Sequence, residues 1–122
     1  MDCSKCIALM AANPGDIWDY SLSKAGGKKN AEFDALPIVC ITTSAGTGSE
    51  VDIAAVISDD ELKEKTGIFF PSMFPTLSVV DADLDDERTP GTYCLSGMDT
   101  FFHASESVIN KKRASHGGDV CT

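Results

Sequence analysis

The chain has 122 residues, of which 43% are hydrophobic, enough for a packed core and too many for wholesale disorder. Nineteen acidic residues stand against ten Lys and Arg, giving a net charge of −9, which argues against nucleic acid or an anionic membrane as a partner because both require cationic patches. No apolar run approaches the ~20 residues of a membrane-spanning helix, and the first residues lead into no signal-like apolar segment. We therefore expect a cytoplasmic protein.

The first predicted element is an amphipathic helix over residues 2–12, with Asp2 as its N-cap and a stop signal at residues 13–15. Its expected apolar face follows the helical period through Cys3, Cys6, Ile7, Met10 and Ala11. A Cys-x-x-Cys pair can be a redox pair or half a zinc site. No second such pair and no close histidine follows, so packing is the favoured interpretation. The five cysteines are an odd number and are expected to be reduced and buried.

Residues 17–20 predict a short helical turn in which Trp18 and Tyr20 anchor the core. Residues 26–30 read as a polar surface loop that lacks the spacing of a phosphate-binding P-loop. Residues 37–42 are a continuous apolar run. Such a run suits a strand buried on both faces, as in a parallel sheet.

The stretch after this strand, residues 43–50, reads Thr-Ser-Ala-Gly-Thr-Gly-Ser-Glu. Open α/β sheets bind ligands at the carboxyl ends of their strands. Glycines let backbone N–H groups approach an anion, and hydroxyls donate to phosphate or ribose. The same composition is also that of an ordinary turn, so both interpretations stay open here.

A second strand is expected over residues 51–57, followed by a polar turn at 58–61 and a partner strand, so a hairpin is predicted. Lys65 on this hairpin is either a solvated lysine or a contact to phosphate or ribose. A further short strand is expected at residues 77–81. A charged connector follows, Pro90 and Gly91 break the pattern, and we place a domain junction near residue 88.

The last element is a helix whose apolar stripe is expected to run through Leu95, Met98, Phe101, Phe102, Val108 and Ile109. Lys111, Lys112 and Arg113 suit its C-terminal dipole, and residues 116–118 are expected to end it. Asp99 and His103 are four residues apart, so they share one face of this helix. A carboxylate and an imidazole placed in this way can bind one divalent metal ion together, or they form an ordinary solvated pair.

Three stretches together resemble the iron-containing (group III) alcohol dehydrogenase family. Residues 2–5 and 11–20 resemble the segment that follows the family's glycine-rich GGGS loop. Residues 43–51 resemble its TTAGTGSEV signature. Gly97, Met98 and Asp99, followed by His103, resemble its GMDALTHAIE metal-binding helix. The match runs in consistent order from residue 2 to about residue 112.

The resemblance implies an α/β fold. Residues 1–88 would be the C-terminal part of a Rossmann-like dinucleotide-binding domain, and residues 89–122 would begin an all-helical metal-binding domain, as in a truncated dehydroquinate synthase-like fold. It also implies hydride transfer between a primary alcohol or aldehyde and NAD or NADP, with Fe(II), or Zn(II), bound by one Asp and three His. Family members often form homo-oligomers.

The resemblance also assigns residues. Asp99 and His103 would be the first two metal ligands, Thr43, Ser44 and Thr47 would line the dinucleotide site, and Lys65 would approach the cofactor. The GGGS loop and two further histidines of the family are absent from the sequence. Thr100, Phe101, Phe102 and Ser105 replace the usual Ala, Leu, Thr and Ile.

We therefore expect an internal fragment that is inactive by itself, because two protein ligands leave much of a metal's coordination sphere to water. Two alternatives remain open at this point. One is a non-catalytic remnant that serves binding or interaction. The other is a small metal-binding module that adds Glu106 or His116 to Asp99 and His103.

Overall fold

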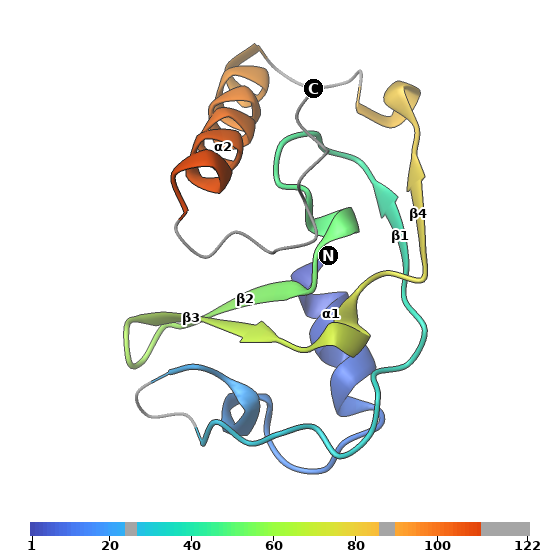
Figure 1. Ribbon diagram of the computed structural model, residues 1–122, viewed down its shortest axis with the longest axis vertical. Helices are drawn as coiled ribbons and strands as arrows, with labels where there is room; N and C mark the ends of the chain where they lie inside the picture. Colours follow the sequence, from blue (N-terminus) through green and yellow to red (C-terminus); the bar gives the residue numbers. More distant parts are fainter. Residues whose placement is uncertain (24–26, 86–89, 111–122) are drawn as a thin grey trace.

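The computed structural model describes residues 1–23, 27–85 and 90–110 of the chain. In the described residues the chain begins and ends with an α-helix, and the strands of two two-stranded sheets lie between these helices in the sequence (Figure 1). The elements in order are α1 (Asp2–Met10), β1 (Val39–Thr42), β2 (Ala54–Asp59), β3 (Glu64–Phe69), β4 (Leu77–Val80) and α2 (Pro90–Ile109). Short 3₁₀ helices lie at Ile17–Tyr20, Ser49–Val51, Pro71–Met73 and Ala82–Asp85. No helix in the described ranges is long and apolar enough to cross a membrane.

The strands form two separate pairs. β1 and β4 are parallel, with Val39 opposite Leu77 and Thr42 opposite Val80. β2 and β3 form an antiparallel hairpin, with Asp59 opposite Glu64 at the turn. The predicted parallel strand and the predicted hairpin are therefore confirmed. β2 begins at Ala54 and not at residue 51, because the chain first makes a 3₁₀ turn.

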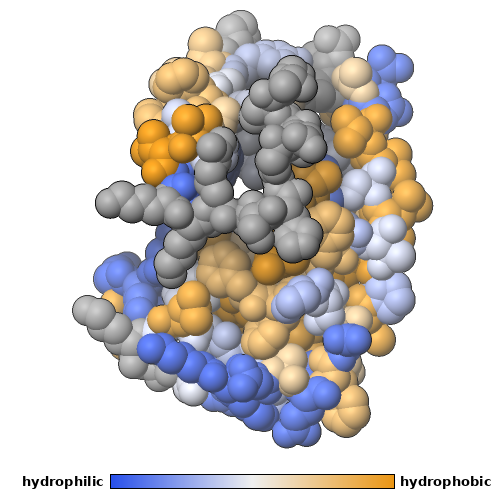
Figure 2. All heavy atoms as spheres, viewed as in Figure 1, coloured by the Kyte–Doolittle hydropathy of each residue, from blue (hydrophilic) through white to orange (hydrophobic). Residues whose placement is uncertain are grey.

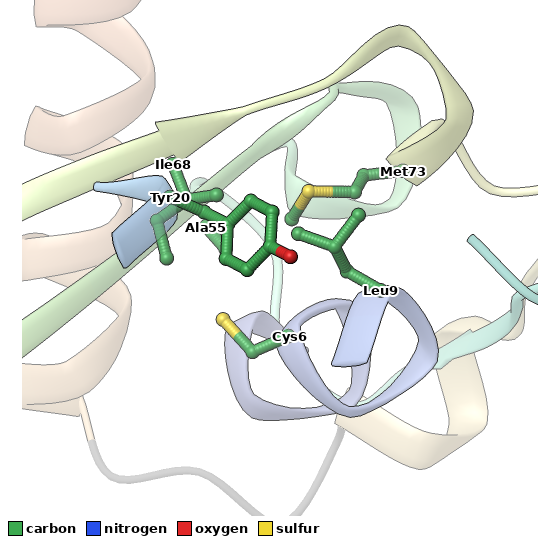
Figure 3. Packing of buried hydrophobic residues seen from close by; sticks show 6 residues of the cluster. All are labelled: Cys6, Leu9, Tyr20, Ala55, Ile68 and Met73. Atoms are coloured by element: carbon green, nitrogen blue, oxygen red, sulfur yellow. The ribbon is translucent and has the colours of Figure 1, made fainter. Parts of the chain in front are cut away.

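The main core lies where α1 packs against the hairpin (Figure 3). Tyr20 belongs to it, as predicted, and is 2% exposed, whereas Trp18 is only partly buried. The hydroxyl of Tyr20 donates to the carbonyl of Pro14 (2.6 Å), so its one polar atom is satisfied. The buried members of this core are Cys6, Leu9, Tyr20, Ala55, Ile68 and Met73.

The predicted face of α1 is wrong in part. Cys3, Ile7 and Ala11 are exposed, and the buried residues are Lys5, Cys6, Ala8 and Leu9. Asp2 is also not the N-cap, since Met1 occupies that position and Asp2 is the first helical residue. The buried face of the helix is rotated from the predicted one because it includes Lys5. The ammonium group of Lys5 can be buried there because it donates to acceptors that lie far along the chain.

The expectation that the apolar strand is buried on both faces is also wrong. In β1, Cys40 and Thr42 are buried, but Val39 and Ile41 are 60% and 58% exposed. Ala8 and Ile38 pack against Cys40 on the inner face. The outer face is exposed because no element of the described chain covers it.

α2 begins at Pro90, which is its first helical residue and not a break in the pattern. A proline suits this position because the N–H that it lacks has no intrahelical acceptor. The predicted apolar stripe of α2 is exposed: Leu95 is 74% and Ile109 75% accessible. The expected junction near residue 88 and helix end at 116–118, together with Lys111, Lys112, Arg113, His116 and Cys121, lie outside the described residues.

Of the four cysteines in the described ranges, all are free, which agrees with the expected reduced state. Cys6 and Cys40 are buried, as expected, but Cys3 and Cys94 are exposed. Burial, followed by the charges of Cys3 and Asp2, raises the pKa of the Cys6 thiol above its ordinary value.

Candidate functional site

A cleft of about 540 Å³ brings together parts of the chain that are far apart in sequence. The start of α1, the loop after β1, the hairpin and α2 all contribute to its walls. Five of the six residues predicted for a site line it, and Thr43 is exposed outside its lining. The lining residues are Met1, Asp2, Ser44, Thr47, Ser49, Asp52, Ala54, Val56, Lys65, Asp99 and His103.

The loop of residues 43–50 forms the cleft wall directly after the carboxyl end of β1. Gly46 and Gly48 have φ angles of +117° and +64°, which residues with a side chain rarely adopt. A Cβ on Gly46 would lie 2.5 Å from the carbonyl oxygen of Ser96. The loop backbone therefore rests directly on α2, and this contact requires glycine.

Lys5 holds α1 against the segment that enters β2 and lines the cleft, a role that sequence reasoning missed. Its side chain is fully buried, and its Nζ donates to the carbonyl of Asp52 (2.9 Å), to Asp52 Oδ1 (2.6 Å) and to the carbonyl of Ala54 (3.0 Å). Asp52 and Ala54 both line the cleft. One pattern in the sequence could have indicated that Lys5 is buried, because Lys5 shares a helix face with Ala8 and Leu9. The sequence does not reveal its acceptors, which are 47 to 49 residues away.

Asp2 makes a second connection at the same end of α1. Its Oδ1 accepts a hydrogen bond from Ser49 Oγ (3.1 Å), and its Oδ2 accepts one from the backbone N–H of Val56 (3.0 Å). Both partners line the cleft. The first turn of α1 therefore fixes the end of the 43–50 loop and the start of β2 relative to each other.

Asp99 and His103 lie one turn apart on α2, with Asp99 Oδ2 3.7 Å from His103 Nε2. Their side chains are 46% and 61% exposed, so both are open to a ligand from the cleft. Two ligands bound about 2.1 Å from a tetrahedral metal lie roughly 3.4 Å apart. The observed separation and the oxygen–nitrogen donor pair therefore fit a divalent transition metal.

The charges around the cleft are distributed unevenly. The carboxylate of Asp52 is paired with Lys5, and that of Asp2 accepts from Ser49 and Val56. Asp99 instead lies beside the imidazole of His103 on the same face of α2, where both line the open cleft. Within the described ranges no group of three His, Cys, Asp or Glu gathers for a metal, and Glu106 does not line the cleft.

Lys65 brings a positive charge into the cleft from the hairpin. It lies on β3 opposite Ser58 of β2 and is exposed at the cleft surface. Ser44 and Thr47 of the loop line the same cleft. Hydroxyls and an ammonium group facing one space are groups that bind phosphate or ribose oxygens.

Comparison with known proteins finds relatives that are dehydrogenases. The family model for iron-containing alcohol dehydrogenases matches residues 1–82. The NAD-dependent methanol dehydrogenase of Bacillus methanolicus is 39% identical over 110 residues, which cover 90% of this chain and 28% of that protein. Choline dehydrogenase of Bacillus subtilis (strain 168) is 37% identical over 111 residues, 91% of this chain and 27% of its own.

Several solved structures share the fold. NADH-dependent butanol dehydrogenase A of Thermotoga maritima superposes with a TM-score of 0.80 at 30% identity, over 88% of this chain and 26% of its own. Sulfoacetaldehyde reductase of Bifidobacterium kashiwanohense, in complex with NAD+, gives 0.77 at 32% identity, over 87% and 27%. The chain thus spans little more than a quarter of the length of these relatives. Because the family model matches well over half of its residues, the chain belongs to the iron-containing alcohol dehydrogenase family.

Proposed function

We propose that the cleft is part of the dinucleotide- and metal-binding site of an alcohol dehydrogenase that transfers hydride between a primary alcohol or aldehyde and NAD or NADP. One observation carries the proposal. Ser44 and Thr47, Lys65, and the Asp99–His103 pair come from three separate segments and line a single cleft. Relatives described as NAD-dependent methanol dehydrogenase and NADH-dependent butanol dehydrogenase support this substrate class and cofactor.

In this proposal Asp99 Oδ2 and His103 Nε2 hold Fe(II), with Zn(II) as the alternative ion. The bound ion supplies a Lewis acid for the substrate oxygen. The chain itself positions the metal donors. α2 presents both donors on one face, and the close approach of Gly46 to Ser96 keeps this face beside the 43–50 loop. Orientation of this kind is a large part of enzymatic rate enhancement.

For the dinucleotide, we assign Ser44, Thr47 and Lys65 to contacts with phosphate or ribose oxygens. Gly46 and Gly48 leave the loop backbone accessible for N–H donors to approach a phosphate. Thr43 keeps its assignment on the family match alone, since its side chain is exposed outside the lining of the cleft.

We propose further that residues 1–88 are the dinucleotide-binding part and residues 89–122 the beginning of the metal-binding part. The described residues offer two metal donors, and water would fill the remaining positions, so the affinity for metal should be weak. The 122-residue chain is therefore expected to be catalytically inactive by itself. The second candidate, a small metal-binding module, requires a third donor such as His116.

Metal binding by matched variants tests the assignment. Equilibrium dialysis of the full chain against Fe(II) under anaerobic conditions, or against Zn(II), should show weak binding that Asp99→Asn and His103→Gln remove. Glu106→Gln is the comparison variant. Glu106 is on the same helix but does not line the cleft, so binding should be unchanged, whereas weaker binding would favour the small metal-binding module. Unchanged binding in Asp99→Asn would overturn the site.

Two further outcomes separate the alternatives. Stoichiometric metal that survives gel filtration would favour the small metal-binding module. Metal-dependent NADH formation from methanol or butanol by the purified chain would overturn the expected inactivity. For the dinucleotide, Lys65→Met should weaken NADH binding measured by fluorescence, while Lys63→Met on the exposed turn should leave it unchanged.

A further inference from the structure

The helix α2 carries different chemistry on two opposite faces. Ser96 marks the side that meets the loop of residues 43–50. Successive residues of an α-helix are rotated by about 100°, so Asp99 and His103, which line the cleft, lie within about 60° of Ser96. Six apolar side chains lie about 100° to 160° away from Ser96, on the other side of the helix. We call them the α2 stripe: Leu95, Met98, Phe101, Phe102, Val108 and Ile109.

The α2 stripe is open to solvent along its whole length. Its residues are between 51% (Met98) and 75% (Ile109) exposed. Figure 2 shows apolar side chains gathered over α2, at the upper left of the view. The residues of the stripe are not among those that line the cleft, so a ligand bound in the cleft would leave the stripe exposed.

The spacing along the stripe is that of a helix that packs lengthwise against a second helix. Leu95, Met98, Phe102, Ser105 and Ile109 follow one another at intervals of three, four, three and four residues. These intervals are those of the a and d positions of a heptad, whose side chains form the seam between two paired helices. Ser105 donates its hydroxyl hydrogen to the carbonyl of Phe102 in the same helix (3.0 Å), so this donor needs no acceptor within the seam.

The residues that flank the seam favour one orientation of a pair of identical helices. Phe101 and Val108 follow it on one side, at the g positions, and Asp99 and Glu106 follow it on the other, at the e positions. In a parallel pair each g position meets an e position of the partner, so the carboxylates lie beside apolar side chains. In an antiparallel pair e positions meet each other, which brings acidic side chains together.

We propose that α2 is a contact surface for a second copy of this chain, with the two α2 helices parallel and related by a two-fold axis. Each copy presents the same stripe, so the contact is self-complementary. Six partly exposed apolar side chains that each lose on the order of 80 Å² bury roughly 1,000 Å² over both copies, the lower limit of a specific interface. The dimer is therefore weak and reversible. This contact is independent of the proposed dehydrogenase function.

Sedimentation equilibrium of the full, reduced chain at 0.1 M salt tests the contact. We expect a monomer–dimer equilibrium. Leu95→Ser removes apolar surface from both halves of the interface and should raise the dimer Kd about a hundredfold, tenfold for each copy. Leu62→Ser is the matched control on the turn between β2 and β3, where Leu62 is 62% exposed, and should leave the Kd unchanged. A chain that stays monomeric, or equal Kd values for the two variants, would overturn the contact.

Disulfide cross-linking tests the pairing and its orientation by a second route. Cys3, Cys94 and Cys121 are first replaced by serine. Leu95→Cys should then give a cross-linked dimer on mild oxidation, because equivalent a positions face each other in a parallel pair. Thr100→Cys is the control, since Thr100 is exposed on the side of α2 away from the stripe, and should stay uncross-linked. Failure of Leu95→Cys to cross-link, or equal cross-linking of both variants, would overturn the proposed pairing.

Discussion

At the scale of single residues, Lys5 shows how a charged side chain becomes part of a core. Its ammonium group has three acceptors at hydrogen-bond distance, one of them the Asp52 carboxylate. Asp52 is 42% exposed, so water can solvate it when Lys5 is lost. Lys5→Met should therefore lower the free energy of unfolding by about 2 kcal/mol, below the roughly 3–5 kcal/mol for breaking a fully buried pair.

Urea denaturation measures this loss, with Lys28→Met as the control. Lys28 is exposed in the loop after the first 3₁₀ helix, so the same substitution there should change the free energy of unfolding by less than about 0.5 kcal/mol. Similar losses in the two variants would show that the buried ammonium group is not what binds α1 to the hairpin.

The thiol of Cys6 makes the free energy of unfolding depend on pH in the alkaline range. Burial raises the pKa of its thiol in the folded chain above the ordinary value of 9.0. Below that value the thiol is protonated in both states and contributes no difference. As the pH rises past 9.0, the unfolded chain releases the proton more readily, so the free energy of unfolding should fall until the pH passes the folded pKa.

Comparison of the intact chain with Cys6→Val isolates this effect, since other groups titrate equally in both. Urea denaturation at pH 8 and at pH 10.5 should show a larger loss for the intact chain than for Cys6→Val. A loss of equal size in both would mean that the Cys6 thiol does not contribute.

At the scale of elements, two glycines give opposite predictions for the same added methyl group. Gly46→Ala places a Cβ 2.5 Å from the Ser96 carbonyl oxygen and also strains a positive φ, so the loop and α2 must separate. We expect a loss of about 1–3 kcal/mol in the free energy of unfolding. Gly97 lies within α2, and no atom of the described residues lies within 4 Å of its Cβ position, so Gly97→Ala should stabilise the chain by about 0.5–1 kcal/mol.

Thermal unfolding followed by circular dichroism distinguishes the two substitutions by the sign of the shift in Tm. The Gly46 variant should also bind NADH more weakly if the loop forms part of the dinucleotide site. Shifts of the same sign in both variants would contradict the close packing of the loop on α2.

Elements with local causes were predictable from sequence. The polar turn at residues 58–61 predicts the hairpin, the apolar run predicts a strand with a parallel partner, and the spacing of Asp99 and His103 predicts their shared helix face. Features that depend on distant residues were not. The buried face of α1 depends on Lys5 reaching acceptors 47 or more residues away, and neither the position of these acceptors nor the contact of Gly46 with Ser96 can be read from neighbouring residues in the sequence.

At the scale of the whole molecule, the described chain exposes a large apolar surface. Figure 2 shows apolar side chains along the side formed by β1 and β4. Val80 is 73% exposed, and neighbouring outward residues are also more than a third accessible. The strand-edge patch consists of Val39, Ile41, Leu77, Val79 and Val80. Surfaces of this kind, next to unpaired strand edges, favour association between copies.

The net charge of −9 opposes this association, and the balance between the two can be tested. The Debye length falls from about 10 Å at 0.1 M salt to about 3 Å at 1 M, so added salt removes repulsion while leaving the apolar attraction intact. Sedimentation velocity should therefore show more association at 1 M than at 0.1 M salt, increasing with protein concentration. Charge-driven association would respond to salt in the opposite direction.

Substitution of one residue in the strand-edge patch separates it from the remaining apolar surface. Ile41→Lys places a cation on the outer face of β1, where the side chain is 58% exposed, so it should reduce association without disturbing the core. Leu62→Lys makes the same chemical change on the turn between β2 and β3, where Leu62 is 62% exposed. Because this turn lies outside the patch, association should persist in that variant. Each substitution changes the net charge from −9 to about −8, which by itself weakens the repulsion between copies, so a reduction in association must come from the loss of apolar surface. Equal reduction by both substitutions would therefore mean that the β1–β4 surface has no special role in how the copies meet.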